Sequence, residues 1–208
     1  SRNPPWTAQM LPISFEFYPP KTDEQRVQLD RTAARLKAHD PDYVSVTFGA
    51  GGSTLSHTPE AIQRLRSEHA YDAAPHISCM GGSRAEIRNL LKLYRAMGAT
   101  RLVTLRGDVP SGMVSPGDLR YANELVEFIR AETGDHFHIE VAAYPETHPQ
   151  ARDAHTDLAH FVAKARAGAD GAITQYFYNA DAYFRFVDDV RAAGVDIPIV
   201  PGIMPISN

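Results

Sequence analysis

Short runs of β-branched and aromatic residues alternate along this chain with longer stretches in which apolar residues recur at helical spacing. The runs that predict strands begin 26 to 37 residues apart, which is the length of one strand–helix repeat. These runs are residues 13–17, 43–48, 75–79, 101–105, 138–143, 171–176 and 198–201. We therefore expect seven parallel strands connected by six helices.

Helix boundaries are also marked in the sequence. Ser83 and Glu86 have the spacing of a capping box, and Thr58-Pro59 indicates an N-cap followed by proline at the first helical position. Three glycines precede predicted strands and suit the left-handed position that ends a helix, namely Gly98, Gly168 and Gly194. The stretches between these signals each present one apolar face, as the i, i+3, i+4, i+7 pattern beginning at Ile87 shows.

Two architectures fit this alternation, an open doubly wound sheet and a (β/α)8 barrel. A doubly wound sheet needs a phosphate-binding turn after its first strand, but here that strand runs into Tyr18-Pro19-Pro20-Lys21. Polar residues close nearly every predicted strand, which favours a barrel with its functional face at the strand ends. Because a barrel typically takes ~250 residues, we expect an incomplete (β/α)8 TIM barrel at residues 12–208, without its eighth strand and preceded by a flexible lead-in at residues 1–11.

The composition narrows the function classes. A formal charge of −4, with acidic and basic residues mixed along the chain, argues against nucleic acid or an anionic membrane as partner. No apolar stretch approaches the ~20 residues of a membrane span, and the first residues do not resemble a signal peptide. The single cysteine, Cys79, excludes an internal disulfide and fits a cytoplasmic location, and we expect it to be a small buried apolar residue.

Most predicted strands end in a polar or ionisable residue. In chain order these are Glu16, Thr47, His76, Arg106, Asp108, Tyr144, Glu146, His148 and Gln175. A barrel gathers the carboxyl ends of its strands at one face, so we expect these side chains to surround a common site.

Glu16 is the first candidate acid in this set. If Phe15 and Phe17 face the outer helices, the two-residue period of a strand directs Glu16 into the barrel. A carboxyl group among aromatic rings loses solvation, which raises its pKa and suits it to donate a proton. The alternative is a structural carboxylate paired with a base such as Arg106.

Two glycine-containing turns are less specific. Gly107 would let the backbone approach a flat ligand between Arg106 and Asp108, although a tight turn with an internal ion pair is an equal alternative. Residues 49–53, GAGGS, lack the Gly-Lys-Ser/Thr ending of a phosphate loop. His76, Glu146 and His148 are suitable metal ligands, but no compact metal-binding spacing accompanies them.

Seven segments of the chain match, in the same order, segments of a known protein family. They are ISFEFYPPKT (13–22), YVSVTFGAGGS (43–53), APHISC (74–79), LVTLRGD (102–108), VAAYPETHP (141–149), GAITQYFYN (171–179) and PGIMPISN (201–208). A segment such as LRGD alone is unspecific, but the set covers nearly the whole chain from residue 13 onward. Together these segments closely resemble the methylenetetrahydrofolate reductases.

This resemblance implies an FAD-binding (β/α)8 barrel that reduces 5,10-methylenetetrahydrofolate to 5-methyltetrahydrofolate. NADH or NADPH reduces the flavin and leaves before the folate binds, and the product supplies methyl groups for methionine synthesis. The resemblance also implies a folate substrate as partner and a homo-oligomer.

Residue roles follow from the same resemblance. Glu16 matches the general acid that protonates a folate ring nitrogen, Asp108 a carboxylate near flavin and pterin, and Gln175 a glutamine that contacts substrate or nicotinamide. The matched flavin-site positions are Thr47, Phe48, Ala50, His76, Arg106, Gly107, Asp108, Tyr121, Ala122, Tyr144, His148, Asp157 and Lys164. His160 and Ala163 depart from the polar or basic residues common in relatives, which puts some diphosphate contacts in doubt.

Two other functions compete with the reductase. One is a metal-dependent barrel lyase or hydrolase that uses His76, Glu146 and His148. The other is a truncated barrel that binds folate or flavin without turnover. Metal analysis and an absorption spectrum would separate these functions from a flavoenzyme.

Overall fold

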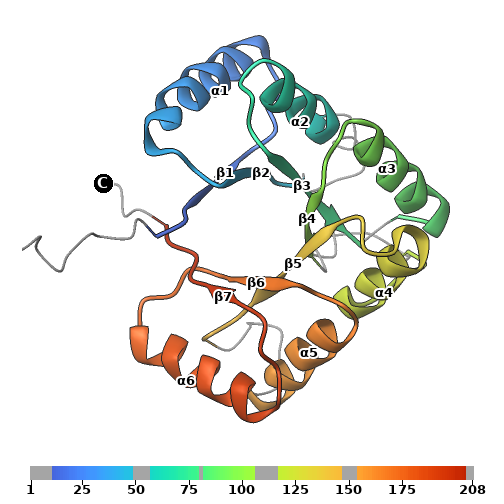
Figure 1. The fold of residues 1–208 in the computed structure, drawn as a ribbon, viewed down its shortest axis with the longest axis vertical. Coiled ribbons are helices and arrows are strands. Elements are labelled where there is room, and N and C mark those ends of the chain that lie inside the picture. The colour runs from blue at the N-terminus through green and yellow to red at the C-terminus, as the bar shows by residue number, and fades with distance from the viewer. Residues whose placement is uncertain (1–10, 49–56, 80–81, 106–116, 147–153, 205–208) are drawn as a thin grey trace, which may run out of the picture.

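The computed structural model describes residues 11–48, 57–79, 82–105, 117–146 and 154–204 (Figure 1). The described residues form one parallel sheet and the helices that cover its outer side. The strands are β1 (Ser14–Phe17), β2 (Tyr43–Val46), β3 (Ala73–Ser78), β4 (Arg101–Leu105), β5 (His138–Ala143), β6 (Gly171–Thr174) and β7 (Ile199–Val200). The helices are α1 (Asp23–Leu36), α2 (His57–Ser67), α3 (Arg84–Ala96), α4 (Ala122–Thr133), α5 (Ala154–Arg166) and α6 (Ala180–Ala192), with a 3-10 turn η1 (Lys37–His39) after α1.

The strands lie in chain order, β1 to β7, and every neighbouring pair is parallel. In Figure 1 they curve around a common centre with the helices outside. Among the described residues, β1 and β7 do not pair with each other. The structure therefore confirms seven strands and six helices of an incomplete (β/α)8 barrel.

Most of the hydrophobic core lies between the sheet and the helices. Strand residues such as Val44 and Ile139 pack there with Ile62 of α2 and Leu91 of α3, and all of these are almost completely buried. Each predicted apolar helix face thus meets the outer face of the sheet. Burial of such side chains stabilises the fold by roughly 1.5–3 kcal/mol each.

The boundary predictions are mostly confirmed. The Ser83–Glu86 capping box forms in both directions at the start of α3. Gly98, Gly168 and Gly194 have φ values of 82°, 120° and 79°, as expected for helix ends. The Thr58 N-cap prediction is wrong, because α2 already includes His57 and the Thr58 hydroxyl donates instead to the carbonyl of Thr47.

Four predicted strands end earlier than expected, those predicted at residues 75–79 and 198–201 by one residue and two others by two residues. The strands predicted at residues 43–48 and 171–176 stop at Val46 and Thr174. One further backbone hydrogen bond follows each of them, from Thr47 to Phe17 and from Gln175 to Ala143. The chain then leaves the sheet, so the residues after these bonds belong to the loops at the functional face.

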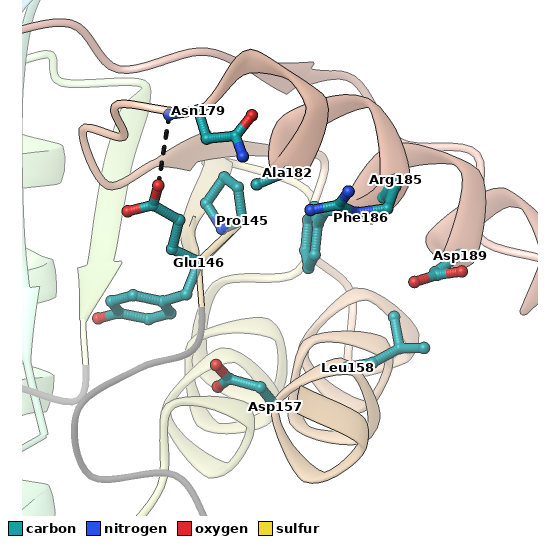
Figure 2. A pocket seen from close by; sticks show the side chains of 10 residues that line it. Pro145, Glu146, Asp157, Leu158, Asn179, Ala182, Arg185, Phe186 and Asp189 are labelled. Carbon is teal, nitrogen blue, oxygen red and sulfur yellow. Dashed lines mark hydrogen bonds between the residues drawn. The ribbon is translucent and has the colours of Figure 1, made fainter. Parts of the chain in front are cut away.

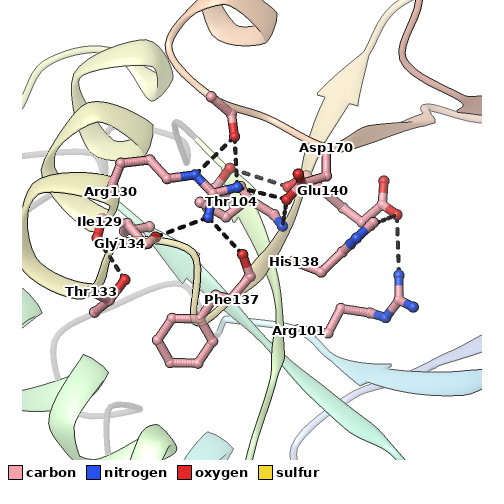
Figure 3. Close-up of polar contacts among 12 residues, drawn as sticks. Arg101, Thr104, Ile129, Arg130, Thr133, Gly134, Phe137, His138, Glu140 and Asp170 are labelled. Atoms are coloured by element: carbon pink, nitrogen blue, oxygen red, sulfur yellow. Dashed lines mark hydrogen bonds and ion pairs between the residues drawn. The ribbon is translucent and has the colours of Figure 1, made fainter.

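Arg130 of α4 connects helices and strands on the amino-terminal side of the sheet (Figure 3). Its guanidinium group donates to the carbonyls of Gly168, Gly134 and Phe137 and pairs with Asp170 at 2.6 Å. The same Asp170 carboxylate accepts from a backbone N–H of β5. One side chain therefore satisfies several carbonyl groups at helix ends that would otherwise lack partners.

Candidate active site

Glu16, Ser45 and His76 meet on the inner face of the sheet, each from a different strand. Parallel pairing places Glu16 of β1 opposite Ser45 of β2. The His76 imidazole of β3 lies with Nε2 3.1 Å from the Ser45 hydroxyl and 3.6 Å from a Glu16 carboxyl oxygen. Phe15 and Phe17 pack toward the core, which confirms that Glu16 points the other way.

The three side chains differ sharply in exposure. Ser45 and His76 are buried, whereas the Glu16 side chain is 56% exposed. Partial desolvation nevertheless raises the pKa of Glu16 above its ordinary value. Burial lowers the pKa of His76 to about 4, so the imidazole is neutral at physiological pH. The arrangement places a carboxyl group with a raised pKa beside an imidazole that stays neutral.

One buried atom of His76 lacks a hydrogen-bond partner in the described part of the chain. The Nδ1 atom makes no hydrogen bond with any described residue. An unpaired polar atom in a buried position costs free energy unless a ligand or water completes it. His76 is therefore suited to contact a polar ligand at this end of the barrel.

Lys164 of α5 is a second buried polar group. Its ammonium group donates to the carbonyl of Ala142 and lies 5.9 Å from the centre of the Tyr144 ring. Burial lowers its pKa to about 8, while the negative charge of Asp157, two turns earlier on α5, opposes that change. The amine is still mostly protonated at neutral pH, so it provides a positive charge between α5 and the end of β5.

Tyr121 and Ala122 lie where α4 begins. Tyr121 is the N-cap residue and remains 46% exposed. Its ring stacks loosely on the exposed His160 of α5, with centroids 6.2 Å apart and planes 17° from parallel. Two of the flavin positions expected from the sequence are thus on the helix start that faces α5.

Thr47 and Phe48 line a cavity of about 680 Å³ beside α1. The cavity is also lined by Phe17 at the end of β1, by residues 18–21 that follow it, and by Gln25, Gln28, Leu29 and Thr32 of α1. Gln175 is exposed immediately after β6. The structure therefore places Thr47 and Gln175 at strand ends, as predicted, but does not bring Gln175 into contact with Glu16.

A second cavity, of about 350 Å³, lies between α5 and α6 (Figure 2). Tyr144 and Asp157 line it, together with Glu146, which accepts a hydrogen bond from the backbone of Asn179. Figure 2 shows acidic side chains around this hollow, with Arg185 on α6 across from Asp157. Glu146 consequently lies at a different part of the site from His76.

The chain was compared with known protein families and with curated proteins. The family model described as methylenetetrahydrofolate reductase matches residues 6–208. This chain belongs to the methylenetetrahydrofolate reductase family. The 5,10-methylenetetrahydrofolate reductases of Salmonella typhimurium and Escherichia coli are each 41% identical over 196 residues, which is 94% of this chain and 65% of each relative. The chain thus spans just under two thirds of the length of these bacterial relatives.

A plant relative and a solved bacterial structure are also similar to this chain. A Zea mays protein named methylenetetrahydrofolate reductase (NADH) 1 is 39% identical over 94% of this chain and 35% of its own length. A solved Clostridium thermocellum protein, described as binding two copies of 5-methyl-5,6,7,8-tetrahydrofolic acid, has a TM-score of 0.66 at 18% identity and covers 91% of this chain and 65% of its own. At that identity the similarity supports the fold alone.

Several positions expected from this reductase family lie outside the described residues. They are Ala50, Arg106, Gly107, Asp108 and His148, together with the glycine-rich residues 49–53. The expected position of Asp108 near flavin and pterin therefore stays a prediction. Within the described part of the chain, the Glu16 carboxyl group pairs with His76 and not with an arginine.

The metal hypothesis receives no support from the residues that can be placed. His76 bonds to Ser45, Glu146 bonds to Asn179, and His148 is not described. The group of possible metal ligands found among the described residues lies elsewhere, at Asp30, Glu68 and His69 on and just after the outer helices.

Reasoning from the sequence missed two features of this reductase-family barrel. Ser45 was not singled out, although its alternation with Thr47 along one strand could have indicated an inward hydroxyl. The second is a buried polar cluster at the opposite end of the strands, where Glu140 pairs with Arg101 at 3.3 Å and with His138 at 2.9 Å (Figure 3). Charged residues at alternate positions of an apolar strand are its signal in the sequence.

Proposed function

We propose that this protein is an FAD-dependent reductase that converts 5,10-methylenetetrahydrofolate to 5-methyltetrahydrofolate with NADH or NADPH as electron donor. The observation that carries the proposal is the Glu16 carboxyl group, half exposed on the inner face of the barrel, with a raised pKa and a neutral imidazole beside it. The names of the bacterial and plant relatives supply the reaction.

The residues of the site fit a flavin dinucleotide. The His76 Nδ1 atom is buried and lacks a partner among the described residues, so it can bond to a polar group of the cofactor. The positive Lys164 side chain has further N–H donors for an anionic diphosphate. Thr47, Phe48, Tyr121, Ala122, Tyr144 and Asp157 complete the described set of expected cofactor contacts. When bound, the flavin carries hydride from the nicotinamide to the folate.

Glu16 carries the proton chemistry in this proposal. Burial raises the pKa of its carboxyl group above the ordinary value, which favours the protonated form that can donate to a folate ring nitrogen. Proton donation opens the five-membered ring and generates the iminium that accepts hydride. Gln175, exposed after β6, is proposed to contact the substrate or the nicotinamide.

Other expectations accompany this proposal as predictions. They are an active part for Asp108 beside the flavin, a homo-oligomeric assembly, a cytoplasmic location and a role in methionine synthesis. A search of the described residues finds no helix that could cross a membrane.

The decisive experiment separates the two half-reactions. Purified protein reconstituted with FAD should be yellow and should bleach anaerobically with NADH or NADPH, and methylenetetrahydrofolate should then reoxidise it. The variant Glu16→Gln should retain flavin reduction within about twofold and lose folate reduction by roughly 10²-fold or more, because only the latter needs the acid. Failure to bind FAD would refute the proposed function, and equal loss of both half-reactions would refute the role of Glu16.

A further inference from the structure

The Ser45 hydroxyl group is positioned by two independent features of the sheet. Parallel register sets Ser45 of β2 opposite Glu16 of β1. On its other side, the hydroxyl lies 3.1 Å from Nε2 of His76 on β3. Ser45 is buried, so water does not compete for this hydrogen bond. The same Nε2 atom lies 3.6 Å from an oxygen of the Glu16 carboxyl group.

We propose that Ser45 and His76 are positioning residues that hold the Glu16 carboxyl group in its proton-bearing form and aimed at the substrate. This inference rests on the proposed function, because Glu16 is the acid in that reaction. Ser45 acts through His76, and neither residue needs to touch the reacting atoms of the folate for this role.

The charge state of His76 decides how the cluster works. A protonated imidazole would form an ion pair with Glu16 and stabilise the carboxylate, which cannot donate a proton. Burial keeps His76 neutral. When the Ser45 hydroxyl donates to Nε2, the imidazole carries its proton on Nδ1 and turns a lone pair, with no N–H, toward the Glu16 carboxyl group, so the ring does not stabilise the carboxylate.

The other ionisable side chains of the inner sheet do not perform this task. Tyr43 of β2, Arg101 of β4 and Glu140 of β5 interact with one another, since the Arg101 guanidinium lies 4.2 Å from the Tyr43 ring centre and pairs with Glu140. On β3, the neutral His76 is the ionisable neighbour found for Glu16 among the described residues, with Nε2 3.6 Å from a carboxyl oxygen. A change at Ser45 therefore reaches Glu16 through His76.

The test compares Ser45→Ala, which removes the hydroxyl, with Ser45→Thr, which keeps it. The titration of Glu16 is followed by carbon NMR of carboxyl-labelled glutamate in the FAD-loaded protein without nicotinamide or folate, and Glu16→Gln identifies the signal. We expect Ser45→Ala to lower the pKa of Glu16 by roughly half a unit to one unit, because the released imidazole admits water to the carboxyl group. Ser45→Thr should titrate like the wild type.

Kinetics provide the second measurement. In single-turnover folate reduction, the rate requires protonated Glu16 and falls as pH rises through its pKa, so Ser45→Ala should shift this profile to lower pH. At neutral pH the rate of folate reduction should drop roughly 3- to 10-fold in Ser45→Ala, while flavin reduction by NADH or NADPH, which does not need the acid, should fall less; Ser45→Thr should stay within about twofold of the wild type.

The outcomes separate this inference from the proposed function. A wild-type protein that does not bind flavin or reduce folate defeats the proposed function, whatever Ser45 does. A functional wild type whose Glu16 titrates identically in Ser45→Ala, or in which both half-reactions fall together, defeats the positioning role. If Ser45→Ala does not fold, Ser45→Cys replaces it in the test, because cysteine has nearly the same volume as serine and a weaker hydrogen-bond donor. The pKa of Glu16 should then shift in the same direction by a smaller amount.

Discussion

At the scale of single residues, Glu140 shows how one buried side chain limits what its neighbours can be. The side chain is only 8% exposed and pairs with Arg101 and His138. On the adjacent strand, a Cβ atom added at Gly171 would lie 2.5 Å from a Glu140 carboxyl oxygen. That oxygen, Oε2, makes no hydrogen bond to a described residue. Glycine is therefore needed at position 171 for space, and not for an unusual backbone angle.

We predict that Gly171→Ala lowers the free energy of unfolding by about 1–3 kcal/mol, because the extra methyl group displaces a buried carboxylate held by two partners. Urea unfolding of the wild type and the variant would measure this difference in the free energy of unfolding. Gly82→Ala is a suitable control, since its Cβ would meet Ile87 at an ordinary 3.7 Å. In a Glu140→Ala background the Gly171→Ala change should cost less than about 1 kcal/mol. An equal cost in both backgrounds would show that Glu140 is not the obstacle.

The residues of the candidate site were predictable to different degrees. The two-residue period of β1 correctly predicted that Glu16 faces inward while Phe15 and Phe17 face the helices. It could not identify His76 as the neighbour of Glu16, because their separation depends on how β1 to β3 pair. Arg106, the neighbour first considered, follows β4 and lies outside the described residues.

At the scale of elements, a cluster of charged side chains joins α1 and α2. Both carboxyl oxygens of Asp30 on α1 accept from Arg64 on α2, at 2.9 and 2.6 Å, and His69 lies 2.8 Å from one of them. The hydrogen bonds from Arg64 lower the pKa of Asp30 to about 2. A lowered pKa means that the cluster stabilises the fold above the ordinary pKa of 3.8, and that this contribution is lost as pH falls toward 2.

We predict that Asp30→Asn lowers the free energy of unfolding by about 1–2 kcal/mol at pH 7, a value discounted for the partial exposure of the pair. The difference from the wild type should narrow between pH 4 and pH 2, as Asp30 becomes protonated in the wild type. Chemical denaturation at several pH values measures the stability difference at pH 7 and its change with pH. Asp196→Asn, which removes a 98% exposed partner of Arg191, should change stability by less than about 0.5 kcal/mol. A pH-independent difference at Asp30 would contradict the ion-pair explanation.

Element boundaries illustrate where local signals were sufficient. The Ser83–Glu86 capping box depends on residues three apart and forms as predicted. Thr58 has an equally suitable local signal, but its hydroxyl bonds to the Thr47 carbonyl at the end of β2. A tertiary contact thus replaced the local cap.

At the scale of the whole molecule, pairing is uneven across the sheet. Strands β3, β4 and β5 are paired on both sides, whereas β1 and β7 are each paired on one side within the described residues. The middle strands are also the longest of the sheet, with five or six residues each, compared with two in β7.

We predict that amide hydrogen exchange in the 208-residue chain is slowest in β3–β5 and at least tenfold faster in β1 and β7, because edge amides open without disrupting the rest of the sheet. Exchange followed by mass spectrometry or NMR would show this gradient. Equal protection of β1 and β3 would indicate that β1 is covered by a partner, for example through self-association.

The sequence by itself determined the number, type and order of the elements. Hydrophobic period and helix-end signals act over a few residues, and strands separated by helices of this length can pair only in parallel. The resemblance of seven segments added the family. Only the tertiary structure decided that Ser45, His76 and Glu16 share one cluster and that Glu140 occupies the space beside Gly171. These contacts join residues about 30 to 60 positions apart, and their geometry depends on the register between strands, which no local pattern specifies.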